Sequence, residues 1–146
     1  MEELMLTPGA SAGLFYAVAF LVSQNGTAYI ESPTYFLALK MIEDLGFDSD
    51  RVVPIPMTSD GLDVDYFENQ LKSRQKEGAS DGDRYSSFLY TIPAYHNPTG
   101  VTLSPAKSKK LVKLSRQFDF LIIADDVYNL LSYSGASLIH NTTIFP

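Results

Sequence analysis

Residues 88–100 read Phe-Leu-Tyr-Thr-Ile-Pro-Ala-Tyr-His-Asn-Pro-Thr-Gly, and this stretch decides the fold. A run of aromatic and β-branched residues, typical of a buried strand, ends there in an Asn-Pro-Thr-Gly turn. A second apolar run, 120–123, ends in a similar way just before Asp125 and Tyr128. In an open α/β sheet, ligands bind at the carboxyl ends of the strands. The two runs therefore predict a site where the Asn97 amide, the Asp125 carboxylate and the Tyr128 phenol converge.

The composition fits one globular domain over residues 1–146. Of the 146 residues, 45% are hydrophobic and 19% are charged, which is enough to bury a sizeable core. The formal net charge of −6 argues against a partner bound through its phosphates, so we expect no nucleic acid. Cysteine is absent, and two histidines alone do not make a metal site, so we expect no metal.

We also expect no membrane segment. The apolar run Leu14–Val22 is far shorter than the about 20 residues that span a bilayer. The chain begins Met-Glu-Glu, which is acidic where a secretory signal would be basic. A cytoplasmic location is the default expectation.

Hydrophobic periodicity and turn residues predict alternating helices and strands. We expect helices at 11–23, from the turn at 32–35 to about 45, at 65–76 and at 105–118, and strands at 27–31, 51–56, 86–92 and 120–124. An Asp65/Glu68 capping box starts the third helix and Ser104-Pro105 the fourth. Residues 77–84 are polar and glycine-rich, so we expect them to be the least ordered. This alternation predicts an α/β fold with three layers and a mostly parallel sheet.

The groups at the strand ends suit pyridoxal phosphate. A carboxylate beside the ring nitrogen favours the protonated pyridine, and Asp125 fits that position because a carboxylate ending an apolar strand needs a partner. Asn97 and Tyr128 can donate hydrogen bonds to the phenolic oxygen of the ring, and Tyr35 can stack on its face. The backbone amides at the start of the first helix can hold the phosphate, and they belong to Gly9, Ala10 and Ser11.

With these residues in place, the chain resembles the central part of a fold-type I, class I/II aminotransferase, closest to the 2-aminoadipate and kynurenine branch. The matching segments are Thr7–Leu14, Glu31–Tyr35, Asn97–Gly100 and Phe120–Tyr128. The resemblance implies an incomplete pyridoxal-phosphate-binding large domain. It gives the seven residues Gly9, Ala10, Ser11, Tyr35, Asn97, Asp125 and Tyr128 the cofactor-binding roles described above. Relatives often have a hydroxyl residue at the position of Ala10, so phosphate binding there would depend on backbone amides.

The resemblance also implies what the printed chain lacks. Family members bind the cofactor covalently through a lysine downstream of the Asp-x-x-Tyr segment, whereas the last lysine here is Lys113. A lysine nucleophile is central to this chemistry. We therefore expect the chain to be a fragment, a truncated gene model or a degenerate copy, inactive by itself. In full-length relatives an amino acid and a 2-oxo acid would be the substrates, and a homodimer would be the assembly.

Two other functions stay open on the residues alone. The chain could be a non-catalytic remnant that binds a partner, such as a full-length relative, through its exposed sheet. Asp125 and Asp126 could instead form a magnesium-binding acidic pair of a phosphoryl-transfer domain. Taken singly, the Asn-Pro-Thr-Gly segment is an ordinary turn sequence, and Tyr35 could simply pack on the core.

Overall fold

The computed structural model describes residues 4–74, 84–128 and 131. In this part of the chain, one five-stranded sheet has the order β3-β2-β1-β4-β5. Its four longer strands run parallel, and β3 pairs with β2 in the antiparallel sense. The strands are β1 (Val22–Ser32), β2 (Val52–Thr58), β3 (Gly61–Leu62), β4 (Tyr85–Thr91) and β5 (Leu121–Ala124).

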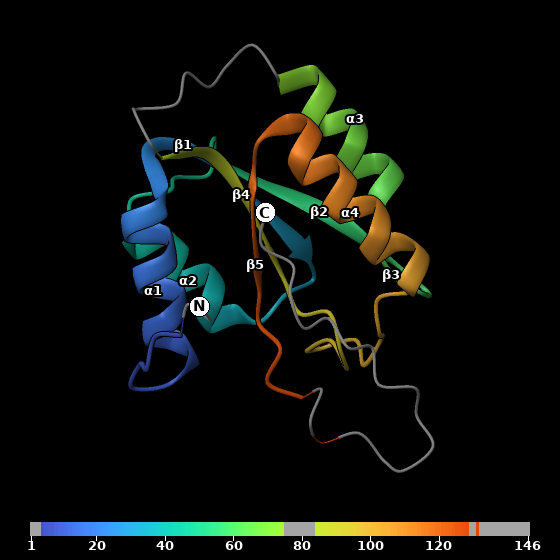
Figure 1. Ribbon diagram of the computed structural model, residues 1–146, viewed down its shortest axis with the longest axis horizontal. Helices are drawn as coiled ribbons and strands as arrows, with labels where there is room; N and C mark the ends of the chain where they lie inside the picture. Colours follow the sequence, from blue (N-terminus) through green and yellow to red (C-terminus); the bar gives the residue numbers. More distant parts are fainter. Residues whose placement is uncertain (1–3, 75–83, 129–130, 132–146) are drawn as a thin grey trace.

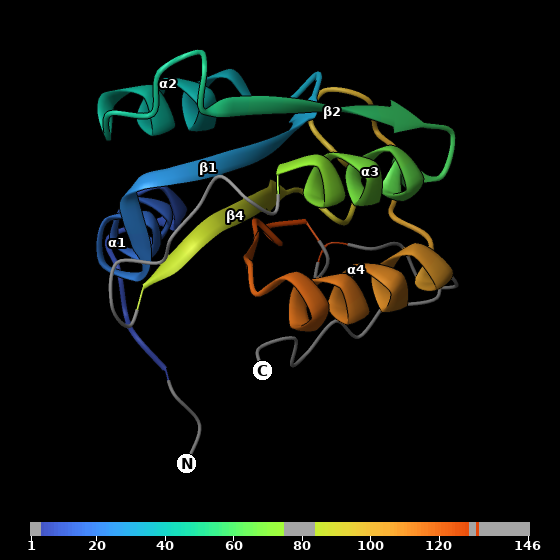
Figure 2. The same cartoon turned by 90° about the horizontal axis from the view of Figure 1, so that it is seen from above.

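Within the described ranges, four helices cover the two faces of this sheet. They are α1 (Ala10–Leu21), α2 (Phe36–Asp44), α3 (Val64–Arg74) and α4 (Pro105–Phe118). As Figures 1 and 2 show, α1 and α2 lie on one face, and α3 and α4 lie on the other. The prediction of a three-layer α/β fold with a mostly parallel sheet is confirmed.

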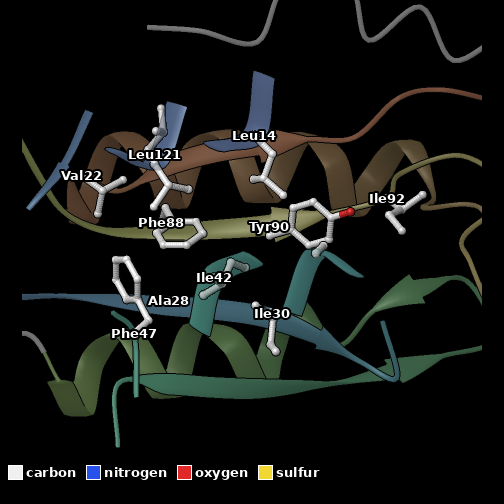
Figure 3. Packing of buried hydrophobic residues seen from close by; sticks show 12 residues of the cluster. Leu14, Val22, Ala28, Ile30, Ile42, Phe47, Phe88, Tyr90, Ile92 and Leu121 are labelled. Carbon is white, nitrogen blue, oxygen red and sulfur yellow. The ribbon is translucent and has the colours of Figure 1, made fainter. Parts of the chain in front are cut away.

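The strands separate two apolar cores because successive side chains of a strand point to opposite faces. On β4, Phe88 and Tyr90 join the core beneath α1 and α2, whereas Leu89 joins the core beneath α3 and α4. Figure 3 shows Phe88 and Tyr90 between Leu14 of α1 and Ile42 of α2. We name these the α1/α2 core and the α3/α4 core. Burial on both faces explains the continuous apolar runs Ala28–Ile30 of β1 and Phe88–Tyr90 of β4.

The strand order reverses between β1 and β4. From β1 the chain proceeds through α2 to β2 on one side, and it later returns through α3 to β4 on the other side of β1. Such a switch point leaves a crevice beyond the carboxyl ends of the two central strands, where ligands bind in open α/β sheets. The segments that follow β1, β4 and β5 therefore meet at one edge of the sheet.

The predicted boundary between the first helix and strand is wrong. The sequence predicted a helix to Ser23, closed by Asn25-Gly26, but α1 ends at Leu21 and β1 begins at Val22. A bulge between Val22 and Thr27 lets the longer strand follow β4. A Cβ at Gly26 would lie 2.9 Å from the carbonyl oxygens of Ser23, in the same strand, and of Ser86, in β4, so this glycine permits close packing instead of ending a helix.

The predicted start of the third helix is also wrong in detail. Asp63, and not Asp65, accepts a hydrogen bond from the first turn, through its Oδ1 from the Tyr66 amide at 2.9 Å. The hairpin strand β3 was not predicted, because two residues carry no periodicity. By contrast, α4 begins at Ser104-Pro105 as the sequence predicted. The expectation of low order at 77–84 concerns residues that, except Arg84, lie outside the described part of the chain.

Replacing Gly61 by alanine should destabilise the protein. Gly61 has a φ of +108°, and a Cβ there would lie 2.6 Å from Leu103 Cδ1 and 2.8 Å from Leu103 Cα. Backbone strain and the clash together should lower the free energy of unfolding by about 2–4 kcal/mol in a urea titration. Gly46→Ala is the matched control, since Gly46 has a φ of +92° and no atom within 4 Å of such a Cβ. Equal losses in the two variants would contradict the clash with Leu103.

Two ion pairs of Glu68, one within α3 and one to α4, should make the stability of the protein decrease at acid pH. Lys110 Nζ lies 2.7 Å from Glu68 Oε2, and Lys72 Nζ lies 2.5 Å from Glu68 Oε1. These hydrogen bonds lower the pKa of Glu68 from 4.5 to about 2. Because the folded-state pKa is the lower one, the stabilisation is present above about pH 5 and is lost as the pH falls from about 5 to 2.

We therefore expect the melting temperature to fall over this pH range, and to fall less in Lys110→Met. Lys109→Met is the control, because Lys109 is exposed on the same helix and takes no part in these ion pairs. Salt should reduce the difference between the variants, since surface ion pairs are screened. An identical pH profile for Lys110→Met and the parent chain would contradict this prediction.

One surface of α1 is apolar although it faces solvent. Phe15, Tyr16, Phe20 and Leu21 are all exposed, and Phe20 is 66% exposed. Within the described residues, no helix combines the length and apolar character that a membrane crossing requires.

Candidate functional site

A cavity of about 360 Å³ lies where α1 begins and where the chain leaves β1, β4 and β5. All seven site residues predicted from the sequence line it, together with Tyr90, Ile92 and parts of α1 and α2. The seven residues are Gly9, Ala10, Ser11, Tyr35, Asn97, Asp125 and Tyr128. The structure thus brings together segments more than a hundred residues apart. Their part in cofactor binding stays a prediction.

The first turn of α1 supplies backbone donors at one end of the cavity. Gly9 precedes the helix with a φ of +94° and has no side chain to cap it. The Gly13 amide makes the first helical hydrogen bond, to the Gly9 carbonyl at 3.3 Å. The amides of Ala10, Ser11 and Ala12 precede that bond and have no acceptor within the helix. Together with the positive end of the helix dipole, they suit an anion such as a phosphate group.

Asp125 is held by a buried tyrosine. The Tyr90 hydroxyl donates a hydrogen bond to Asp125 Oδ2 at 2.7 Å, and the Asp125 amide donates to the Thr91 carbonyl at 2.9 Å. Tyr90 is fully buried, and this burial, followed by the bond to Asp125, raises the pKa of its phenol. The phenol therefore stays protonated and donates to a carboxylate, so that Asp125 presents negative charge to the cavity.

Aromatic and amide groups complete the wall. Tyr35 stands just before α2, and Tyr128 follows β5; both are partly buried against the α1/α2 core. Asn97 lies in the turn after β4 and is joined to Pro98 by a cis peptide bond. Tyr35 packs on the α1/α2 core, as the alternative interpretation of this residue expected, and it also lines the cavity.

These groups fit pyridoxal phosphate chemically. The cavity volume lies within the roughly 300–1,000 Å³ of small-molecule sites. It offers a carboxylate for a ring nitrogen, an amide and a phenol for a ring oxygen, and a helix N-terminus for a phosphate. The described residues that line it include no lysine, so among them nothing is available to hold the cofactor covalently.

Three residues that shape this site were not predicted from the sequence. Tyr90 could have been predicted, because Phe88 and Tyr90 alternate along β4 and therefore share one face of the sheet, and Asn97 follows the end of the same strand. Glu31 and His96 are both 1% exposed and lie beneath the Asn97 turn. No periodicity distinguishes them from surface polar residues, since their burial depends on contacts between distant segments.

One known protein family matches nearly the whole chain. The sequence model of the family "Aminotransferase class I and II" matches residues 1–143. Aromatic-amino-acid aminotransferase 1 of Thermococcus litoralis is 32% identical over 133 residues, 91% of this chain and 30% of that protein. The mitochondrial kynurenine/alpha-aminoadipate aminotransferase of Rattus norvegicus is 32% identical over 90% of this chain and 31% of that protein.

Solved structures agree with this match. The kynurenine aminotransferase of Pyrococcus horikoshii, in complex with PMP, has a TM-score of 0.70 and 26% identity over 82% of this chain and 28% of its own. An aspartate aminotransferase from Rhodobacter sphaeroides has a TM-score of 0.72 and 27% identity over 92% of this chain and 32% of its own.

The chain spans about 30% of the length of the curated relatives that it matches. The predicted resemblance is confirmed, and so is the prediction that the chain matches only part of such a protein. The family match and the PMP bound in the related structure indicate pyridoxal phosphate as the family's cofactor. The family match, the sheet topology and the cavity at the switch point agree with one another. On this evidence, the chain belongs to the class I and II aminotransferase family.

Proposed function

We propose that this chain is the cofactor-binding portion of a pyridoxal-phosphate-dependent aminotransferase. The observation that carries the proposal is the cavity that gathers the free amides of α1, the Asp125 carboxylate and the Asn97 amide at the β1/β4 switch point. When bound, pyridoxal phosphate supplies an electron-accepting ring for amino-group chemistry. In the full-length protein, the reaction would move an amino group from an amino acid to a 2-oxo acid.

Each group has a separate task in this proposal. The amides of Ala10 and Ser11 bind the phosphate, and Tyr35 packs against the face of the ring. Asp125 keeps a proton on the ring nitrogen, and the buried Tyr90 holds the Asp125 carboxylate in place. Asn97 and Tyr128 donate to the phenolic oxygen of the ring. The seven residues thus bind and orient. Covalent attachment would need a lysine other than the described residues that line the cavity, which include none.

The test is equilibrium dialysis of the chain against pyridoxal 5′-phosphate, with pyridoxal and inorganic phosphate as comparison ligands. We expect saturable binding at one site, competition by phosphate, and at least about tenfold weaker binding of pyridoxal, which lacks the charged group. Binding should be reversible, so borohydride should trap no adduct concentrated on one lysine. Absence of saturable binding would refute the proposal, and an adduct at a single lysine would refute reversible binding.

One observation favours a second, non-catalytic function in partner binding. The exposed apolar surface of α1, formed by Phe15, Tyr16, Phe20 and Leu21, suits a protein interface such as that of a homodimer. Sedimentation of the chain and of Phe20→Ser would test this function, with weaker association expected for the variant. The phosphoryl-transfer alternative has its own outcome, because magnesium-dependent phosphorylation of Asp125 or Asp126 would support it.

A further inference from the structure

A buried acid and a buried imidazole face each other beneath the turn that carries Asn97. Glu31 and His96 are each 1% exposed, and Glu31 Oε2 lies 3.1 Å from His96 Nε2. The ring is not aligned for a hydrogen bond along this line, so the contact is an electrostatic one. Fully buried ionisable groups are rare in proteins unless they are paired. Their presence here needs a reason beyond packing.

Glu31 ties the two central strands together. It stands near the end of β1, and its Oε1 accepts a hydrogen bond from the Thr91 hydroxyl at 2.6 Å. Its Oε2 accepts from the Ile92 amide at 2.8 Å. Both donors belong to the end of β4 and the residue after it. The carboxylate therefore fixes the two strand ends between which the sheet reverses.

His96 organises the turn from the other side. Its Nδ1 lies 2.8 Å from the Thr99 hydroxyl oxygen and 3.5 Å from the Thr99 amide. A backbone amide next to Nδ1 makes that nitrogen the acceptor, which assigns the ring proton to Nε2, the ring nitrogen nearer to Glu31. The His96 amide donates to the Val101 carbonyl at 2.8 Å, and the Gly100 amide donates to the His96 carbonyl at 2.6 Å. The turn closes around the imidazole.

We propose that Glu31 and His96 are positioning residues that set the Asn97 amide toward the ring end of the cavity. This inference rests on the proposed function. Asn97 lines the cavity, whereas neither Glu31 nor His96 does, so the pair acts through Asn97 and not by touching the ligand. The backbone of Asn97 continues from the anchored His96. The side chain of Asn97 therefore takes its direction from the turn that Glu31 and His96 hold.

The test is a double-mutant cycle on the whole chain, read as the dissociation constant of pyridoxal 5′-phosphate. His96→Leu and Asn97→Ala should each weaken binding by about tenfold, and the double variant should bind no more weakly than Asn97→Ala alone. A purely structural role would instead multiply the two effects, and that result would overturn the proposal. His96→Gln, which keeps an N–H donor beside Glu31, should recover most of the affinity lost in His96→Leu.

Two further readouts separate positioning from general damage. Inhibition by inorganic phosphate, which probes the α1 end of the cavity, should be unchanged in His96→Gln and in Glu31→Gln. Hydrogen exchange of the ligand-free chain should speed up at the Gly100 and Val101 amides in His96→Leu and in Glu31→Gln, and it should stay unchanged in α3 and α4. Faster exchange throughout the sheet would overturn the proposal.

The hydrogen-exchange measurement does not depend on ligand binding. If the parent chain binds no pyridoxal phosphate, the proposed function fails, and local exchange still decides whether Glu31 and His96 hold the turn. If the parent chain binds the ligand but the cycle is additive, the positioning inference fails and the proposed function survives. The two failures are therefore distinguishable.

Discussion

Replacing Asp125 by asparagine should weaken pyridoxal phosphate binding by about 10- to 100-fold without unfolding the chain. An asparagine oxygen can still accept the hydrogen bond from the Tyr90 hydroxyl, which lies 2.7 Å from Asp125 Oδ2. What disappears is the negative charge that favours a protonated ring nitrogen. Hydrogen bonds to charged groups contribute about 1.5–3 kcal/mol, which corresponds to this change in dissociation constant. Equilibrium dialysis measures the affinity, and a thermal melt checks the fold.

Asp126→Asn is the matched control, because Asp126 is the neighbouring carboxylate and does not line the cavity. It should bind the cofactor as the parent chain does. Equal losses in the two variants would show that general negative charge, and not the position of Asp125, matters. Asp125→Ala should in addition lower the melting temperature, because it leaves the buried Tyr90 hydroxyl without its acceptor.

Replacing Phe67 by alanine should cost about 3–5 kcal/mol of unfolding free energy. Phe67 is fully buried in the α3/α4 core. Its ring contacts Tyr29 and Phe120 edge to face, at centroid distances of 5.0 and 5.2 Å. The variant therefore loses apolar burial and two aromatic contacts, and leaves a cavity. Because domains of this size are stable by about 5–15 kcal/mol, a urea titration should show a large shift or loss of the cooperative transition.

Phe20→Ala is the control for this prediction. Phe20 lies on α1 and is 66% exposed, so its loss should change the unfolding free energy by about 0.5 kcal/mol or less. Similar losses in both variants would mean that the α3/α4 core does not stabilise the chain as described. Phe67→Leu should fall between the two, since it keeps most of the apolar volume.

The layered fold was predictable because its signals are local. Apolar residues that recur every 3.6 positions identified helices that pack against the sheet, and continuous apolar runs identified strands. Ser104-Pro105 marked the start of α4 correctly. The limits of β1 were not predictable from one segment. Val22 is a strand residue only because it pairs with Tyr85, more than sixty positions away. Likewise, Asp63 and Asp65 both resemble helix caps, and only the geometry of the turn selects Asp63.

The candidate site was predictable to a different degree. Residues at strand ends and helix starts could be assigned to one edge of the sheet, because parallel strands align their carboxyl ends. The groups behind the site could not. Tyr90, Glu31 and His96 support the cavity wall through contacts among β1, β4, the 96–101 turn and Asp125 after β5. Such contacts exist only after the strands have paired.

The sheet leaves the cavity on the face of α1 and α2, while Phe67, Leu111 and Leu114 fill the opposite face without reaching it. The apolar core that stabilises the fold and the cavity that would bind a ligand thus lie on opposite faces of the sheet. A protein engineer could therefore raise the thermal stability of the α3/α4 side while leaving the ligand contacts intact. Changes on the opposite side could then adapt the cavity to new ligands without loss of that added stability.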